Sequence, residues 1–292
     1  DDMLTTQLMA TKAPIFLCPA MNTNMYENPI TQRNMQTLRD LGFHILEAAS
    51  GSLACGTSGI GRLPEPVDIV NWLSFHVGRT DLLADKTVIV TAGGTREAID
   101  PVRYIGNHSS GKMGYAVAAQ AAMAGARTIL ISAPTSLEVP YGVEYVPVDS
   151  AEAMKAAVDA RYEEADAVIM TAAVADFKVE NAASSKIKKM DTLDLHLVKN
   201  PDILKGLGER KTHQKLIGFA AETNDVIEYG KTKVLTKNLD MLVANDVSKK
   251  NIGFNADDNE VTFIYSGGQI VNLPLMTKND VAKRIISALA EL

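Results

Sequence analysis

Side chains that could do chemistry gather in residues 107–114, NHSSGKMG, where amide, hydroxyl and ammonium groups follow one another. The β-branched run at residues 87–91 stops at Gly93-Gly94, a pattern typical of a buried parallel strand that enters a glycine turn. Residues 112–124 have a strongly helical pattern that ends at Gly125. Unpaired backbone N–H groups and the helix dipole favour an anion at such a helix N-terminus. The stretch therefore predicts an anion-binding cradle.

Two familiar nucleotide-binding motifs do not explain this stretch. Gly106 and Gly111-Lys112 have the spacing of a Walker A loop, but Met113 stands where a Ser or Thr would bind Mg²⁺. The glycines after the strand, Gly93-Gly94, do not continue as G-x-G-x-x-G, which disfavours a dinucleotide-dependent oxidoreductase. An ordinary strand-to-helix connection explains the glycines but not the high density of polar side chains in this stretch.

Bulk properties exclude several classes of function. The chain has 292 residues, enough for one large or two ordinary domains, and its net charge of -6 argues against a nucleic-acid partner. No apolar run reaches the roughly 18 residues of a membrane span, and no signal peptide is visible. The two cysteines show no CxxC spacing and suggest a reducing, cytoplasmic setting.

From residue 85 on, apolar strand patterns alternate with helical ones, which predicts an α/β fold with a doubly wound, mostly parallel, Rossmann-like sheet and an antiparallel edge hairpin. We expect this domain over residues 85–292 and a smaller α/β part over residues 1–80, with residues 50–61 as a glycine-rich loop. Asn200 and Pro201 are expected to open a helix. Ligands of such sheets bind beyond the carboxyl ends of the strands, where small or polar residues follow Thr91, Thr171, Phe219 and Ala244.

Lysines are the first candidates for binding phosphate. Lys186, Lys188 and Lys189 follow a long segment without periodicity, and such segments are usually functional. A solvated charge run is the competing interpretation. Lys233 and Lys237 share a helix face and either grip phosphate or are exposed.

The other candidates are single residues, most of which also have a purely structural interpretation. Asp176 follows a predicted strand, where it binds Mg²⁺ or hydrogen-bonds to a base or a ribose; the alternative is a structural aspartate in a turn. Phe219 is either a platform on which a base stacks or a residue of the hydrophobic core. Asn22 suits a carboxylate, and Cys55 on a glycine loop is either a proton donor or a small buried side chain. The five histidines have no metal-ligand spacing.

Ordered motifs along the chain resemble those of the bacterial bifunctional phosphopantothenoylcysteine decarboxylase / phosphopantothenate-cysteine ligase family of coenzyme A synthesis. The segments TAGGTRE, DPVRYIGNHSSGKMG, TAAVADF, KIKK, VKNPDIL, GFAAET, KNLD, ANDVS and GFNADDNEV are similar to a complete ligase domain. PAMNTNM and ACGTSGIGR look like the second half of the flavoprotein decarboxylase domain.

The resemblance implies a two-step synthetase. The carboxylate of 4'-phosphopantothenate attacks the α-phosphate of CTP, and the amine of L-cysteine then displaces CMP from the acyl-cytidylate. Mg²⁺ is implied by the triphosphate, with protein ligands that stay unassigned. A homodimer through the ligase domain is also implied, in which a neighbouring subunit helps to close the site. For the parent protein, the resemblance further implies a larger assembly through the flavoprotein domain.

Site residues follow from the matching motifs. Asn107 is implied as the catalytic residue that binds phosphopantothenate and the acyl intermediate, and Lys186 as the lysine on the CTP phosphates. Ser109, Ser110, Gly111 and Lys112 complete the implied substrate site. The implied nucleotide pocket consists of Met170, Thr171, Ala172, Asp176, Lys186, Pro201, Asp202, Ile203, Leu204, Phe219, Lys233 and Lys237.

For the decarboxylase part, Asn22 matches the substrate-clamping asparagine and Cys55 the reductive proton donor. The chain looks as if it begins inside that domain, so we expect it to be incomplete and expect the chain alone not to hold FMN. A non-catalytic nucleotide-binding or assembly module remains the alternative to the CTP-dependent ligase.

Overall fold

The computed structural model describes residues 2–53, 56, 58–189, 191–222, 226–246 and 256–292, and the chain divides after Gly78 into two compact units. Each unit has its own core. Within the described residues, none of the helices is both long and apolar enough to cross a bilayer.

The first unit is small and thinly buried. It contains α1 (Met3–Ala10), β1 (Phe16–Leu17), α2 (Thr23–Tyr26), α3 (Pro29–Asp40), β2 (His44–Ile45), β3 (Ala49–Ser52), β4 (Ser58–Arg62) and α4 (Pro66–Gly78). Strands β1 and β2 pair in parallel, and their aromatic rings Phe16 and His44 stack at 4.5 Å between centroids. The expected loop at residues 50–61 is wrong in part, because β3 and β4 pair there as an antiparallel hairpin.

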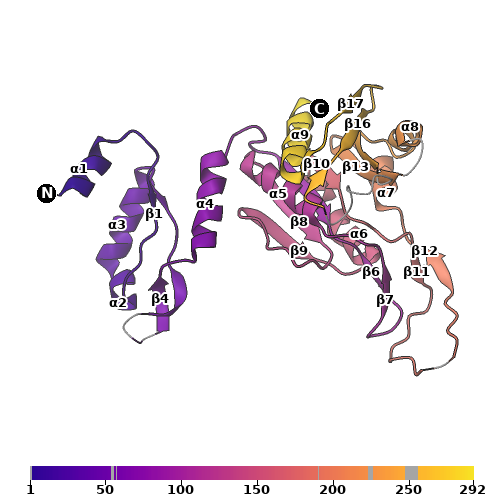
Figure 1. The fold of residues 1–292 in the computed structure, drawn as a ribbon, viewed down its shortest axis with the longest axis horizontal. Coiled ribbons are helices and arrows are strands. Elements are labelled where there is room, and N and C mark those ends of the chain that lie inside the picture. Colours follow the sequence, from indigo (N-terminus) through magenta and orange to yellow (C-terminus); the bar gives the residue numbers. More distant parts are fainter. Residues whose placement is uncertain (1, 54–55, 57, 190, 223–225, 247–255) are drawn as a thin grey trace. The chain divides into compact units, whose positions relative to one another are not determined.

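The second unit is built on one large sheet. In the part of the chain that the structure describes, eight strands follow in the spatial order β17-β16-β14-β13-β10-β5-β8-β9 (Figure 1). Their bounds are β17 (Ile270–Asn272), β16 (Val261–Tyr265), β14 (Met241–Asp246), β13 (Lys215–Glu222), β10 (Ala167–Met170), β5 (Thr87–Ala92), β8 (Arg127–Ser132) and β9 (Val143–Pro147). From β9 to β14 the pairs are parallel, whereas β16 and β17 add antiparallel partners at one edge.

The strand order reverses direction between β5 and β10, because the chain first builds outward through β8 and β9 and then crosses back. This is the order of a doubly wound Rossmann sheet, and the reversal leaves a crevice at the carboxyl ends of these two strands. The predicted fold class is confirmed.

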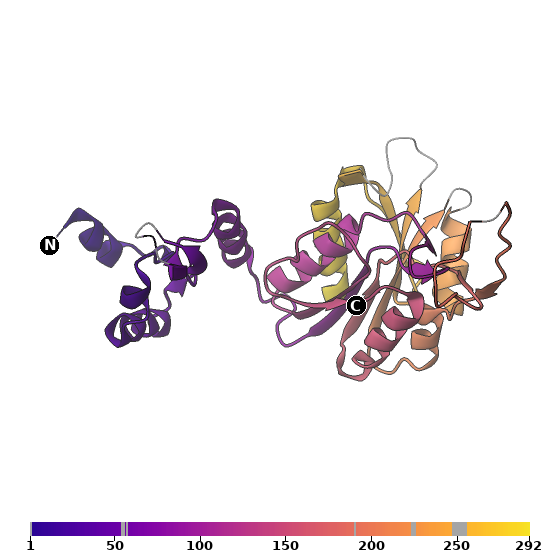
Figure 2. The same ribbon diagram turned by 90° about the horizontal axis from the view of Figure 1, so that it is seen from below.

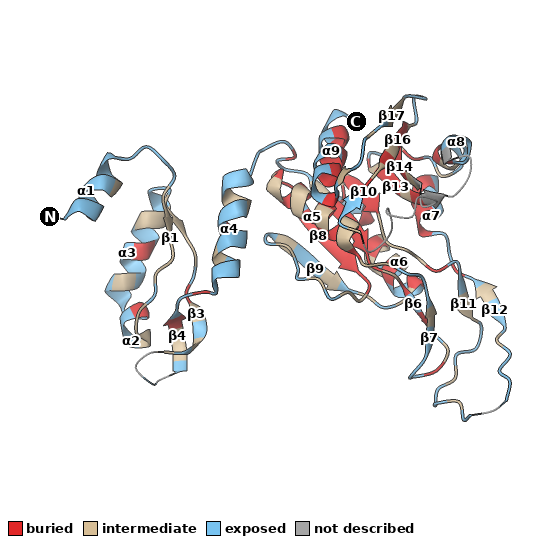
Figure 3. Ribbon diagram, in the orientation of Figure 1, coloured by how far each residue is buried: buried red, intermediate tan, exposed pale blue. Residues whose placement is uncertain are grey.

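Helices cover both faces of this sheet (Figure 2). Residues of α5 (Lys112–Met123) and α9 (Lys278–Glu291) pack in one buried cluster, and those of α6 (Ala151–Asp159), α7 (Ile203–Glu209) and α8 (Val226–Thr236) pack in another. In β5 the pleat sends Val88 and Val90 into the first cluster and Ile89 into the second. Both faces of the central strands are therefore apolar and buried (Figure 3), which is why their sequences are continuous apolar runs.

Short elements decorate the sheet near its carboxyl edge. They are the antiparallel pairs β6 (Arg96–Ala98) with β7 (Tyr104–Gly106), β11 (Phe177–Val179) with β12 (Leu197–Lys199), and β15 (Asp258–Asn259) with β18 (Met276–Thr277). The 3-10 turn η1 (Tyr162–Glu164) instead precedes β10, at the amino end of that strand. Most were not expected from the sequence, since two or three residues carry no readable periodicity.

One helix start differs from the expectation. The predicted helix opening at Asn200 and Pro201 is displaced, because Asp202 is the N-cap of α7 and its side chain accepts the N–H of Lys205 at 3.0 Å. Asn200 instead lies buried before the helix and donates to the carbonyl of Ala175 at 2.9 Å. The aspartate is favoured because its carboxylate satisfies an unpaired N–H and complements the helix dipole.

Candidate functional site

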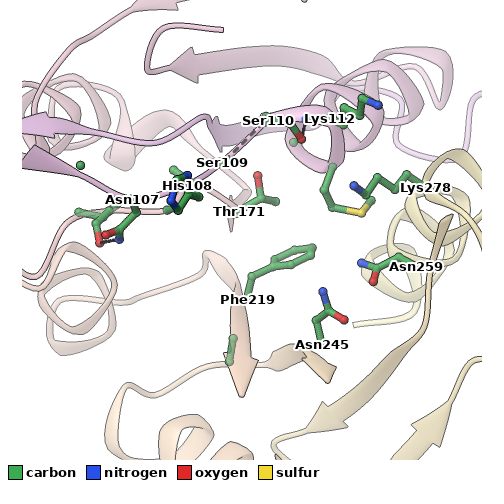
Figure 4. A pocket seen from close by; sticks show the side chains of 18 of the residues that line it. Asn107, His108, Ser109, Ser110, Lys112, Thr171, Phe219, Asn245, Asn259 and Lys278 are labelled. Atoms are coloured by element: carbon green, nitrogen blue, oxygen red, sulfur yellow. Dashed lines mark hydrogen bonds between the residues drawn. The ribbon is translucent and has the colours of Figure 1, made fainter. Parts of the chain in front are cut away.

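A pocket of about 580 Å³ opens where β5, β10, β13 and β14 end, at the crevice left by the strand-order reversal. Figure 4 shows Asn107 and His108 at one end, Asn245, Asn259 and Lys278 at the other, and Thr171 and Phe219 between them. The described residues that line it are Gly106, Asn107, His108, Ser109, Ser110, Gly111, Lys112, Met113, Gly114, Thr171, Ala172, Ala173, Val174, Asp176, Phe219, Ala220, Lys233, Asn245, Asn259 and Lys278.

The glycine turn after β5 brings two loops into contact. Gly93 has a φ of +77°, a conformation that favours glycine, and a Cβ on Gly94 would lie 2.6 Å from the carbonyl oxygen of Asn107. A larger residue at position 94 would push the loop of Asn107 away from the strand end. The two glycines therefore let the polar loop pass directly over the end of β5.

The N-terminus of α5 faces the pocket without a side-chain cap. Its N-cap is Gly111 with a φ of +76°, a residue that has no side chain to cap the first turn. The hydroxyls of Ser109 and Ser110 accept long hydrogen bonds from the N–H groups of Gly111 and Lys112, at 3.3 and 3.4 Å. Bonds of this length are weak, and a helix N-terminus without a capping side chain favours an anion.

The end of β10 forms the middle of the pocket and is tied to β5. The Thr171 hydroxyl donates to the carbonyl of Thr91, and the N–H of Ala172 donates to the Thr91 hydroxyl at 3.2 Å. The Asn107 amide reaches across to donate to the carbonyl of Val174 at 3.2 Å. These bonds hold the Asn107 loop against the segment that follows β10.

Two lysines and two amides make up the opposite end. Lys278, the first residue of α9, is 8% exposed and donates to the carbonyl of Ala256. Burial lowers the pKa of Lys278, and the nearby Lys112 lowers it further. Lys112 pairs with Asp257, with 2.6 Å between Nζ and Oδ1. Because two ammonium groups are close together where one is almost fully buried, this end of the pocket favours an anionic group.

An amide oxygen also lacks a partner here: Oδ1 of Asn245 is buried and accepts no hydrogen bond within the described residues. A buried acceptor without a donor is costly and is usually satisfied by a ligand or water. Asn245 is the second-last residue of β14, so this acceptor lies near the carboxyl end of the strand.

Many of the sequence-predicted site residues come together in this pocket. Of the substrate set, Asn107, Ser109, Ser110, Gly111 and Lys112 line it, and of the nucleotide set Thr171, Ala172, Asp176, Phe219 and Lys233 do. They derive from segments more than 100 residues apart that meet at the carboxyl ends of parallel strands.

Other predicted nucleotide residues do not line the pocket. The core cluster that contains residues of α6 and α7 also includes Met170, and Ile203 and Leu204 of α7 are buried in it. Pro201 is exposed. Asp202 caps α7 and pairs with Lys237 at 2.9 Å; burial raises its pKa, but the hydrogen bonds from Lys237 and the Lys205 N–H bring the pKa below its usual value.

Lys186 is also outside the pocket lining of this chain. It is exposed in the long connection between β11 and β12, which Figure 1 shows running away from the sheet. Lys188 and Lys189 of the same connection are exposed as well.

Sequence reasoning missed Asn245, Asn259 and Lys278 as single residues. Asn245 stands directly after a predicted strand, which is a usable signal, and Asn259 lies within a quoted motif. Lys278 had no signal of its own, since the first residue of a surface helix is normally solvated.

The first unit carries the remaining predicted residues. Asn22 caps α2 and lines a hollow of about 360 Å³ with Met21, Ser52, Leu53, Gly61, Arg62 and Leu63. These lining residues include no aromatic ring, and an amide beside a guanidinium suits a carboxylate. Cys55 lies outside the described residues.

No cluster of three or more His, Cys, Asp or Glu side chains that could hold a metal ion is found among the residues that the structure describes. Asp176 is the carboxylate among the described lining residues. Carboxylate oxygens are among the ligands that Mg²⁺ prefers, so the side chain of Asp176 is chemically suited to this ion.

Both units match families of known proteins. The family model described as DNA/pantothenate metabolism flavoprotein C-terminal domain matches residues 83–292, and the flavoprotein model matches residues 1–77. The expectation of an incomplete decarboxylase part gains no support from these matches.

Relatives with the same two parts are similar over the whole chain. The coenzyme A biosynthesis bifunctional protein CoaBC of Bacillus subtilis is 48% identical over 296 residues, which cover 100% of this chain and 73% of that protein. The crystal structure of the C-terminal domain of a CoaBC protein is 43% identical with a TM-score of 0.64, and the match covers 73% of this chain and 97% of that one. A Cab2 mutant in complex with phosphopantothenate-cysteine shares the fold, at 17% identity and a TM-score of 0.58, over 78% of this chain and 94% of that one.

The sheet order, the strand-end pocket and these matches agree, and the chain belongs to the DNA/pantothenate metabolism flavoprotein family, whose bifunctional members act as ligase and decarboxylase in coenzyme A biosynthesis.

Proposed function

We propose that the second unit joins 4'-phosphopantothenate to L-cysteine at the expense of CTP, through an acyl-cytidylate intermediate. The observation that carries this proposal is the pocket itself, because the loop of Asn107 lines one cavity together with Thr171, Asp176 and Phe219. A reaction between two anions needs such a site, where donors and cations neutralise both.

The reaction has two balanced steps. A carboxylate oxygen of phosphopantothenate forms a bond to the α-phosphorus of CTP, and the bond to the bridging oxygen breaks so that pyrophosphate leaves. The amine of cysteine then attacks the acyl carbon, CMP leaves with the electron pair of the acyl–oxygen bond, and the nitrogen loses a proton. The product is phosphopantothenoylcysteine.

The charges of the pocket suggest how the acid lies in it. The phosphate end belongs near Lys112, Lys278 and the uncapped N-terminus of α5, where positive charge is concentrated. The carboxylate end then lies toward Asn107, whose amide is at the opposite end of the pocket. CTP occupies the part lined by Thr171, Ala172, Phe219 and Lys233, where Asp176 would hold an Mg²⁺ ion that neutralises phosphate charge.

Lys186 is proposed to act in the pocket of the partner subunit. We propose a homodimer in which the β11–β12 connection reaches the pocket of the neighbouring subunit, since Lys186 is exposed and does not line the pocket of its own chain. There its ammonium group would stabilise the negative charge that builds up on the phosphates of CTP.

An assay of pyrophosphate release tests the ligase. Release should require phosphopantothenate and should be fastest with CTP among the four nucleoside triphosphates in the presence of Mg²⁺, and CMP and the cysteine amide should form only after cysteine is added. The competing proposal, a non-catalytic nucleotide-binding module, predicts CTP binding without release. Absence of release with all four nucleotides would refute the ligase.

The flavoprotein part leads to a second prediction. The parent protein is proposed to be an FMN-dependent decarboxylase, with Asn22 holding the substrate carboxylate and Cys55 donating a proton. We expect the present chain on its own not to retain FMN, since the described lining around Asn22 suits a carboxylate better than a flavin ring. The chain is mixed with FMN, separated from free flavin by gel filtration, and its absorption is measured; a stoichiometric oxidised-flavin spectrum would contradict the expectation.

A further inference from the structure

A buried carboxylate lies outside the pocket and contacts the Lys186 connection. The side chain of Asp100 has no exposed surface and belongs to the turn that joins β6 to β7. Its Oδ1 accepts the N–H groups of Val102 and Arg103 at 2.8 and 2.9 Å. Its Oδ2 accepts Nε of Arg103 at 3.0 Å and also pairs with Nη2 of that residue. The hydrogen bonds from Arg103 hold the pKa of Asp100 well below its usual range, so the carboxylate stays charged.

The side chains of Asp100 and Arg103 also contact a residue that is distant in the sequence. Oδ2 of Asp100 accepts the N–H of Ile187 at 3.1 Å, and Nη2 of Arg103 donates to the carbonyl of Ile187 at 3.1 Å. Both backbone polar groups of the residue next to Lys186 are therefore held. A further bond, from the N–H of Ala183 to the carbonyl of Ile99 at 2.9 Å, fastens the connection to the same turn.

This double attachment matters because the described part of the connection has no regular secondary structure of its own. In the described residues between β11 and β12, which leave out residue 190, no helix or strand occurs. Ordering a flexible backbone costs conformational entropy, so a connection that is already held loses less entropy when its lysine meets the phosphates. The turn of Asp100 also continues through β7 directly into Asn107.

We propose that Asp100 is a positioning residue of the ligase, which presets the Lys186 connection by holding Ile187 through its Oδ2 while its Oδ1 keeps the turn before Asn107 in shape. The proposal rests on the proposed role of Lys186 for its kinetic consequence, but the attachment itself can be tested separately.

Asp100→Asn is the discriminating variant. An asparagine keeps Oδ1 and hence the two turn bonds, but its amide nitrogen cannot accept from Ile187 or Arg103. Asp166→Asn is the matched control, because Asp166 also accepts a backbone N–H from a distant segment, that of Thr87 at 2.8 Å, and pairs with Lys86, but at the opposite ends of the strands.

The first measurement is limited digestion with trypsin, followed by mass spectrometry of the cuts after Lys186, Lys188 and Lys189. Because local opening governs cleavage of a folded chain, Asp100→Asn should raise the rate of these cuts about tenfold, and Asp166→Asn should leave them unchanged. Unchanged cutting in folded Asp100→Asn protein would overturn the proposal, whether or not the chain proves to be a ligase.

The second measurement is the rate of pyrophosphate release. Asp100→Asn should lower kcat about tenfold and change the KM for phosphopantothenate less than about twofold, because the lysine acts in the transition state. Equal losses in Asp100→Asn and Asp166→Asn would reduce Asp100 to a stabilising residue and contradict the positioning role. If the unaltered chain releases no pyrophosphate, the proposed function fails, while the digestion result still decides on the attachment.

Discussion

Lys186→Gln is expected to slow CTP-dependent pyrophosphate release by about 10²–10³-fold, because a preorganised charge on the reacting phosphates contributes on this scale. Glutamine keeps a polar side chain of similar reach but removes the positive charge. Lys186 is exposed, so the free energy of unfolding should change by no more than about 0.5 kcal/mol. Initial rates at saturating CTP and urea unfolding curves measure the two quantities.

Lys205→Gln is a suitable control for this variant, since Lys205 is an exposed lysine whose pairing is with Glu209 on its own helix at 3.9 Å. It should keep the full rate. A Lys186→Gln protein with the rate of the control would remove Lys186 from the mechanism.

Co-expression of Lys186→Gln with Asn107→Asp chains reveals which subunit supplies the lysine. If the site combines Asn107 of one chain with Lys186 of its partner, each heterodimer has one intact and one doubly altered site, so about a quarter of all sites are active after equal mixing. If both residues act within one chain, no intact site forms. Activity near that of the single variants would therefore reject the shared site.

Gly114→Val is expected to have the largest effect on stability. Gly114 is buried in α5, where an added Cβ would overlap the Thr171 hydroxyl and would lie 2.6 Å from the Cβ of Ala92 and 2.9 Å from the carbonyl oxygen of Thr91. Two of these neighbours belong to β5, whose backbone cannot move without disturbing the sheet. Overpacking of this kind costs about 3 kcal/mol or more in the free energy of unfolding.

Gly206→Ala provides the comparison. Gly206 is also helical, in α7, but nothing lies within 4 Å of an added Cβ. Alanine should leave stability unchanged or raise it by up to about 1 kcal/mol, because it favours helix more than glycine does. Urea unfolding measures both variants, and equal stability of Gly114→Val and the unaltered chain would show that α5 does not pack on β5 as described.

Sequence patterns were sufficient for the framework of the second unit. The run at residues 87–91 and the glycines after it predicted a buried strand that ends at a binding loop, and the structure has β5 ending at Ala92 beneath the loop of Asn107. This succeeded because a strand that is buried on both faces must be continuously apolar, and its carboxyl end must meet those of its parallel neighbours. Thr171 and Phe219 were found in the pocket for the same reason.

Short strands and caps were beyond such patterns. The pairs β6–β7 and β3–β4 went unseen because a few residues of extended chain are stabilised by their partner strand rather than by their own sequence. Asp202 rather than Asn200 caps α7, since the choice between two nearby capping residues depends on which side-chain oxygen meets the free N–H.

By itself, the sequence determined which apolar residues repeat with the period of a strand or a helix and where glycines permit tight turns. It also determined that the Asn107 loop precedes a helix N-terminus. Only the tertiary structure decided that Asn245, Asn259 and Lys278 complete the pocket, that Lys186 stays outside it, and that Asp100 holds Ile187. The physical reason is that periodicity records whether a side chain is buried, whereas a site depends on which distant segments the sheet order brings together.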